Sequence, residues 1–199
     1  MCEQFWARWM SSVSLVMVGM IVSGAAMAVE EPPYRVLKSA GQMELREYPG
    51  FVVAETIVQG DFDEAGRSGF RRIAGYIFGG NRNERGESEK IAMTAPVTME
   101  KTQDAWRLHF VMPGSARLET LPRPQAPDVT LRQVGTHRVA TIRFSGFTTK
   151  ASIDEHTEAL QQWMASEGLL AAGQSQIARY NDPFTLPWNR RNEILIEVR

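Results

Sequence analysis

The sequence repeats itself at a fixed offset of 86 residues, and this repeat limits the folds that the chain can adopt. Short identities fall in one ungapped register: Leu45-Arg46 with Leu131-Arg132, Val53-Ala54 with Val139-Ala140, Gly60 with Gly146, Ala65 with Ala151, and Ile91-Ala92 with Ile177-Ala178. The alternating segment "WRLHFVM" (106–112) falls on the alternating segment "NEILIEV" (192–198). Because these matches lie at the same places in successive predicted elements, they indicate an internal duplication.

Each half has the pattern of two strands, a helix and two further strands. The first strand pair breaks at Pro49-Gly50 in one half and at Gly135 in the other. A helix is predicted between Asp61 and Gly79, and a second between Ser152 (or Thr149) and Gly168, because each range opens with a capping residue and closes with glycine. The remaining predicted strands are 90–99 with 105–112, and 176–184 with 192–198.

These patterns predict an α+β protein made of two β-β-α-β-β halves, at about residues 34–112 and 120–198. An antiparallel sheet of eight strands has two edges to protect, and pairing one half with the other would close it. We therefore expect a distorted antiparallel eight-stranded barrel flanked by two helices, which forms a single domain over residues 34–199.

The first 28 residues have the layout of a secretory signal peptide. Arg8 precedes an apolar run at 13–22, and the pattern Ala26-Met27-Ala28 is typical of a cleavage site. A membrane-spanning helix needs roughly 20 apolar residues, so no stable membrane insertion is expected after cleavage. Residues 29–33 would then be a short linker, and the mature protein would be periplasmic, or secreted if the source has no outer membrane.

Composition argues against several classes of function. The one cysteine, Cys2, lies in the predicted signal peptide, so the mature protein has no disulfide, thiol nucleophile or thiolate metal site. The formal net charge of −1, with the signs interspersed, argues against a nucleic-acid partner. Common catalytic motifs are absent and we expect no enzymatic activity. His109, His137 and His156 lack metal-ligand spacing and are expected on solvated strand or helix faces, so no metal site is predicted.

Two motifs, "KIAMTAPV" (90–97) and "YNDPF…WNRRNEI" (180–194), together resemble the SOUL heme-binding protein family. The opening "MELREYPG" (43–50) and the predicted helix "FDEAGRSGFRRIAGYIFGGN" (62–81) fit the same pattern. The resemblance runs from about Tyr34 to Arg199 and, with the signal peptide, suggests an exported bacterial member. It implies the same duplicated fold and non-covalent binding of heme or a related tetrapyrrole.

The resemblance also implies where the tetrapyrrole would lie. In animal members the heme is proposed to lie against the first helix and a loop between the last strands, with basic helix residues near the propionates. The first basic position corresponds to Arg67 and the second to Gly75; Arg71, one turn after Arg67, would replace the missing cation. The apolar part of the site would comprise Phe70, Ala74, Pro183, Phe184, Leu186 and Trp188.

The heme iron has no predicted axial ligand. One branch of the family has a histidine in an "R-H-Y" triplet, and Glu47 stands at that position in this sequence. A carboxylate is a poor substitute for imidazole at heme iron. The resemblance therefore implies heme held by an apolar pocket, without a strong axial protein ligand.

Two groups of arginines also have structural interpretations. Arg67 and Arg71 would suit a solvated helix face that binds no ligand. Arg190 and Arg191, which precede Glu193, would suit a clamp on a turn, formed by bidentate pairing with a carboxylate. For this second group we favour the structural role.

The motif "KIAMTAPV" is interpreted as a feature of the fold and not as the site. Its Ile-Ala pair recurs in "QIARYNDPF" (176–184), which also has a later proline. Because Pro96 has no N–H to donate, its strand should lie at an edge or a bend. Thr94 or Tyr180 would satisfy the backbone groups that such a bend frees.

The sequence favours a carrier, buffer or scavenger that binds heme or a related tetrapyrrole in an apolar surface pocket. The alternative is a module that binds other amphipathic or cationic small molecules, since duplicated folds of this type resemble effector-binding domains. Glu47 or Glu193 would then supply a buried carboxylate. Preference for a cationic ligand over an anionic porphyrin would separate the two functions.

Overall fold

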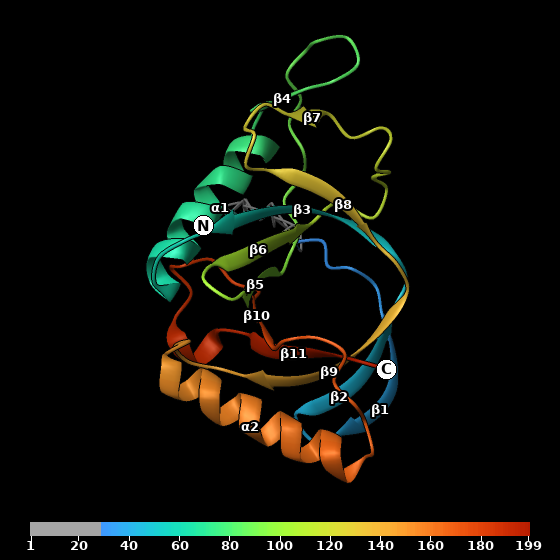
Figure 1. Ribbon diagram of the computed structural model, residues 1–199, viewed down its shortest axis with the longest axis vertical. Coiled ribbons are helices and arrows are strands. Elements are labelled where there is room, and N and C mark those ends of the chain that lie inside the picture. Colours follow the sequence, from blue (N-terminus) through green and yellow to red (C-terminus); the bar gives the residue numbers. More distant parts are fainter. Residues whose placement is uncertain (1–28) are drawn as a thin grey trace, which may run out of the picture.

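The computed structural model describes residues 29–199, so the predicted signal peptide and its cleavage site lie outside the described residues. Two helices pack against one face of a large, curved antiparallel sheet (Figure 1). The sheet contains β1 (Arg35–Ala40), β2 (Met43–Tyr48), β3 (Phe51–Val58), β5 (Val97–Lys101), β6 (Trp106–Val111), β8 (Thr130–Val134), β9 (His137–Phe144), β10 (Gln176–Arg179) and β11 (Asn192–Val198). The other elements are α1 (Phe62–Ile77), α2 (Lys150–Ser166), a 3-10 turn at Pro187–Asn189, and the short pair β4 (Asn81–Arg82) and β7 (Arg123–Pro124).

The sheet is open, so the predicted closed barrel is wrong. Its strand order is β1-β2-β9-β11-β10-β5-β6-β3-β8, and the edge strands β1 and β8 do not pair with each other. The sheet has nine strands instead of eight because β1 folds back on β2 through a tight turn at Gly41, where φ is 62°. Only glycine adopts this backbone conformation without strain. As a result, β1 occupies the edge of β2 that β8 would need to close the sheet.

The predicted pairing of strands within each half is also wrong for the first two strands. β2 pairs with β9, and β3 pairs with β8, so the chain exchanges strands between the halves at Pro49-Gly50. The resulting order is symmetric about the contact between β10 and β5. Read outward from that contact, β10-β11-β9-β2 on one side corresponds to β5-β6-β3-β8 on the other. The internal duplication itself stays a prediction.

The segment "KIAMTAPV" is mostly irregular, whereas a strand was predicted from residue 90. β5 begins at Val97, directly after Pro96, and it lies in the middle of the sheet between β10 and β6. The chain therefore bends at the proline, as expected, but the strand is not at an edge. Thr94 donates its hydroxyl hydrogen bond to the Val111 carbonyl, as the sequence suggested, while the Tyr180 hydroxyl bonds a carboxylate instead of a backbone group.

Both helices begin at capping residues. The Asp61 side chain accepts a hydrogen bond from the Glu64 N–H at 2.8 Å, and the Thr149 hydroxyl accepts from the Ser152 N–H at 3.2 Å. The second helix therefore starts at the earlier of the two positions that the sequence allowed. None of the helices within residues 29–199 is long and apolar enough to cross a membrane.

The two faces of the sheet differ in character. The face that carries the helices forms the main core, in which strand residues such as Phe110 and Ile194 pack with Ile73 and Leu160 of the helices. The opposite face, called the inner face below, carries a smaller apolar cluster of Tyr48, Val139, Ala178 and Leu195. Side chains alternate between these faces along each strand, so polar residues of the inner face lie between core residues in the sequence.

Residues 29–33, predicted as a linker, contact the folded domain. The Glu30 carboxylate accepts a hydrogen bond from the Gly114 N–H at 2.7 Å, and the Glu30 carbonyl accepts one from the Ala95 N–H at 2.8 Å. Glu31 pairs with Arg191 at 2.9 Å. This segment is therefore fixed along one end of the sheet.

Candidate functional site

The pairing of β5 with β10 brings the predicted loop close to the first helix. Val97 lies opposite Arg179, so the segment before β5 and the loop after β10 leave the sheet at the same end. The Arg179 guanidinium lies 4.7 Å from the centre of the Phe62 ring, which places the start of α1 at that end as well. A cleft of about 410 Å³ lies there, and its lining includes Asp63, Phe147, Arg179, Asp182, Pro183 and Arg190.

The loop at 181–191 is fixed by hydrogen bonds to its own backbone. Asp182 accepts hydrogen bonds from the N–H groups of Phe184 at 2.7 Å and Thr185 at 3.1 Å, and these bonds hold the pKa of its carboxyl below the ordinary value. Arg190 donates to the carbonyls of Thr185 at 2.8 Å and Pro183 at 2.9 Å. Arg190 therefore clamps the turn, as predicted, but it does so through backbone carbonyls and not through a carboxylate.

The apolar side chains of this loop that were predicted to contact the heme lie on the outside of the loop. Phe184 is 94% exposed and Trp188 is 69% exposed, and Leu186 and Pro183 are exposed as well. Because polar groups of the loop hold its shape, these apolar side chains are not needed to form it. Contiguous exposed apolar side chains of this size commonly mark a binding surface.

The predicted helix residues lie on one side of α1. Arg67, Phe70 and Arg71 are exposed and Ala74 is half-buried. In the part of the chain that the structure describes, neither Arg67 nor Arg71 forms an ion pair or a hydrogen bond. Arg72 differs, since it pairs with Asp128 at 2.9 Å and so has a structural partner.

Of the predicted site residues, only Pro183 lines the cleft between the start of α1 and the loop. Pro183 of the loop and Asp63, one turn before Arg67, both line this cleft. The other predicted residues lie beyond its lining, on the exposed surfaces of α1 and of the loop.

The inner face contains a buried ionic network that sequence analysis found only in part. Glu193 is fully buried, and its carboxylate accepts hydrogen bonds from Arg46 at 2.7 and 3.1 Å, from Arg191 at 3.0 Å and from the Tyr180 hydroxyl at 2.8 Å. Burial alone would raise the pKa of Glu193, but the hydrogen bonds and charges of both arginines outweigh it and lower the pKa. The predicted pairing of Arg191 with a carboxylate is confirmed, whereas the role of Arg46 was missed.

The two carboxylates considered for a cationic ligand are both engaged. The Glu193 oxygens already accept four hydrogen bonds, so this carboxylate has no capacity left for a ligand. Glu47 pairs with Arg35 at 2.6 Å and with Arg138 at 3.2 Å, near the surface.

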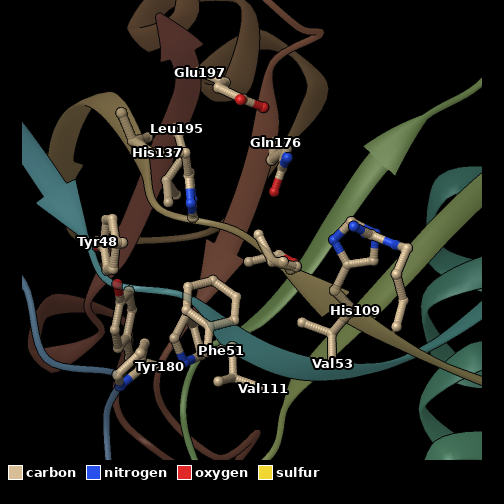
Figure 2. Close-up of a pocket in the computed structure, with 16 residues that line it drawn as sticks. Tyr48, Phe51, Val53, His109, Val111, His137, Gln176, Tyr180, Leu195 and Glu197 are labelled. Atoms are coloured by element: carbon tan, nitrogen blue, oxygen red, sulfur yellow. The ribbon is translucent and has the colours of Figure 1, made fainter. Parts of the chain in front are cut away.

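A small cavity of about 120 Å³ lies over the inner face (Figure 2). Tyr48, Phe51 and His137 form an aromatic wall, in which the His137 ring stacks on Tyr48 with 5.6 Å between centres. Typical sites for drug-sized ligands measure roughly 300–1,000 Å³, so this cavity is too small for a tetrapyrrole.

His109 lies on the strand face opposite Leu108 and Phe110, as predicted, but that face is covered, and the predicted solvation of His156 is wrong. His109 is only 8% exposed on the inner face, and burial lowers its pKa to about 4. His156 lies on α2, and its ring stacks on Phe144 of β9 with 4.1 Å between ring centres. The sheet curves, so both of its faces are partly covered. No cluster of three or more His, Cys, Asp or Glu side chains suited to a metal ion occurs within the described residues.

The comparison with known protein families agrees with the sequence motifs. The profile of the SOUL heme-binding protein family matches residues 29–197. The chain belongs to the SOUL heme-binding protein family. Human heme-binding protein 2 is 29% identical over 189 residues, covering 88% of this chain and 89% of the relative. Heme-binding protein 1 of Xenopus laevis is 25% identical, covering 89% of this chain and 97% of the relative.

Solved structures share the fold of this SOUL family chain at low sequence identity. The C-terminal domain of EcmrR superposes with a TM-score of 0.59 at 13% identity, covering 79% of this chain and 97% of that domain. A protein from Listeria innocua described as a hydrolase superposes with a TM-score of 0.55 at 14% identity, covering 82% of this chain and 94% of that chain. At these identities the similarity shows a common fold and no common activity.

Proposed function

We propose that this protein binds heme or a related tetrapyrrole reversibly and without covalent attachment, as a carrier, buffer or scavenger. The binding surface comprises Arg67, Phe70, Arg71, Ala74, Pro183, Phe184, Leu186 and Trp188. The observation that carries the proposal is the exposure of Phe184 and Trp188 on a loop whose shape is fixed by other residues. The names of the relatives, heme-binding proteins 1 and 2, support the ligand class.

The residues present fit a tetrapyrrole with acidic side chains. The macrocycle is flat and apolar, and burying it against exposed aromatic side chains gains roughly 25 cal/mol for each Å² of apolar surface removed from water. Arg67 and Arg71 lie one turn apart on the same side of α1 and have no protein partners among the described residues, so both are available to the propionates.

We propose that the iron receives no strong axial ligand from the protein. None of the three histidines lies on α1 or in the loop at 181–191. His109 and His137 line the inner cavity, while His156 lies on α2 and stacks on Phe144 of the sheet. The heme would therefore be held by its faces and its propionates.

Three further parts of this proposal rest on the sequence. Residues 1–28 have the pattern of a signal peptide, and we propose that the protein is exported to the periplasm. We propose binding without catalysis, because the sequence has no catalytic motif. We propose no nucleic-acid partner, because the charges are mixed and nearly balanced.

The experiment is a hemin titration of residues 29–199, followed by Soret absorbance, with Arg67→Ala/Arg71→Ala beside the unmodified protein. Arg72→Ala is the matched control, since it removes one cation from the same helix at a position that already pairs with Asp128. The proposal expects saturable one-to-one binding that the double variant weakens at least tenfold and the control leaves unchanged. A signal that never saturates, and that is equal in all three proteins, would show non-specific partitioning and overturn the proposal.

A further inference from the structure

The cavity on the inner face is separate from the proposed heme surface and has the features of a second binding site. Its lining comes from eight strands and includes none of the residues assigned to heme. Figure 2 shows aromatic side chains of Tyr48, Phe51 and His137 on one side of the space and His109 on another, with Gln176 and Glu197 above. Two ends of the sheet thus meet around one apolar space with polar groups at its rim.

His109 is a buried polar group without a partner. Its side chain is nine-tenths buried, and its Nε2 atom makes no hydrogen bond in the described protein. The nearest carboxylate oxygen, of Glu55, is 3.4 Å away and outside good hydrogen-bond geometry, and it is paired with Arg132 at 3.0 Å. Buried polar groups in folded proteins nearly always have a hydrogen-bond partner, so this imidazole offers a hydrogen-bonding atom to a molecule that enters the cavity.

The lining contains two charged side chains, Arg132 and Glu197. Glu197 is exposed at the mouth of the cavity and has no ion pair within residues 29–199. Since Arg132 is matched by Glu55, Glu197 leaves one uncompensated negative charge in the lining. Burial lowers the pKa of His109, with a smaller opposing effect from Glu55 and smaller lowering effects from Arg132 and Arg107, so the imidazole is neutral and able to accept a hydrogen bond.

The size of the cavity limits the ligand to about one ring. Its volume is about 120 Å³, slightly below the roughly 150 Å³ of a cavity that holds benzene, so one ring would occupy all of it and a larger ligand would extend out of its mouth. The stacked pair of Tyr48 and His137, with Phe51 at its edge, offers an aromatic surface for such a ring. We propose that the cavity binds a single planar ring that carries a hydrogen-bond donor, of the aromatic amide or amidine class, with the donor directed toward His109 and Glu197.

The test uses three probes of equal shape and different charge: benzamidine, benzamide and benzoate. Each is titrated into ¹⁵N-labelled residues 29–199, and amide shifts are followed in two-dimensional NMR spectra. Benzamide and benzamidine should shift the amides of Val139 and Leu195, which line the cavity, with dissociation constants of about 1 mM, as expected for ligands of nine heavy atoms. Benzoate, which lacks a donor and is repelled by Glu197, should bind at least about fivefold more weakly.

Two variants test the roles of the polar groups. His109→Phe should abolish benzamide binding, because it fills the cavity and removes the acceptor. Glu197→Lys changes an exposed residue, so it tests the site even where the first variant is unstable. It should weaken benzamidine about threefold more than it weakens benzamide, because both lose an acceptor and only benzamidine also loses an opposite charge. The proposal is overturned if benzoate binds as tightly as benzamidine, or if the shifted amides lie outside the cavity. It is also overturned if none of the probes shifts these amides at a concentration about 10 times the expected dissociation constant. Hemin affinity is measured separately, so failure at this cavity is distinct from failure of the heme proposal.

Discussion

The buried carboxylate of Glu193 lies 2.7 Å from the guanidinium of Arg46, although 147 residues separate the two in the chain. Arg46 lies on β2 and Glu193 on β11, and the two strands are held apart by β9. Tyr180 and Arg191 complete the hydrogen bonding of the carboxylate. Because both side chains are withdrawn from water, the negative charge of Glu193 and the positive charge of Arg46 depend on each other for compensation.

Removing Arg46 should therefore destabilise the fold strongly. We expect Arg46→Ala to lower the free energy of unfolding by about 3–5 kcal/mol, because it leaves Glu193 buried without its main partner. Urea unfolding of residues 29–199 at pH 7 measures this loss. Arg35→Ala is the control, since Arg35 pairs with Glu47 on the surface, and it should cost less than about 1 kcal/mol. Equal costs for the two variants would show that burial does not determine the energy of these pairs.

The pH dependence of stability should report the burial of His109. Burial lowers the pKa of His109 to about 4, below its ordinary value of 6.5, with smaller effects of either sign from Glu55, Arg107 and Arg132. Below pH 6.5 the unfolded chain takes up a proton that the folded protein does not bind. Stability is therefore lost as the pH falls from 6.5 to 4, by about 3 kcal/mol from this residue.

His109→Gln should remove this part of the pH dependence. The free energy of unfolding is measured by urea at several pH values between 7 and 4 for both proteins. The acidic residues titrate in both, so the informative quantity is the difference between the two curves. As the pH falls from 7 to 4, the free energy of unfolding of the variant should rise by about 3 kcal/mol relative to that of the unmodified protein. Two parallel curves would contradict the burial of a neutral imidazole.

The sequence predicts where the helices and strands of this fold lie better than it predicts which strands pair with each other in the sheet. Alternation and capping depend on residues close in the chain, so the strand pattern around Pro49-Gly50 and the helix start at Asp61 are visible locally. The pairing of β2 with β9 joins segments about 90 residues apart, and no local signal specifies it. A proline-glycine turn that closes a hairpin and one that sends the chain to another strand look alike in sequence.

The residues of the inner face were misjudged for a related reason. "MELREY" (43–48) has charges beside apolar residues, which is typical of a strand with one solvated face. In the curved sheet that face is covered, so Arg46 and His109 are buried and need partners. The useful signal was the position of Arg46 two residues before Tyr48, which puts the guanidinium on the same face as a buried aromatic ring.

The exposed loop residues should affect heme binding without affecting stability. Phe184 and Trp188 are mostly exposed, so Phe184→Ser/Trp188→Ser should change the free energy of unfolding by less than about 1 kcal/mol. The same change should weaken hemin binding at least tenfold, because the macrocycle loses its apolar contacts. Leu170→Ser is the control, since Leu170 is an equally exposed apolar residue in a different segment. Equal hemin affinity in the double variant and in the unmodified protein would exclude this loop from the site.

Two glycines of α1 should respond in opposite ways to the same substitution. A Cβ atom at Gly69 would lie 2.6 Å from both methyl carbons and 3.0 Å from Cγ of Leu108, which is buried in β6 and has little room to move. A Cβ atom at Gly75 would meet nothing within 4 Å.

Alanine is favoured over glycine in a helix by about 1 kcal/mol, so Gly75→Ala should raise the free energy of unfolding by about 0.5–1 kcal/mol. Gly69→Ala gains the same helix propensity but must displace Leu108, and a net loss of about 1–2 kcal/mol is expected. Urea unfolding of the two variants measures both effects against the same background. If Gly69→Ala were as stabilising as Gly75→Ala, α1 could not approach β6 as closely as the structure shows.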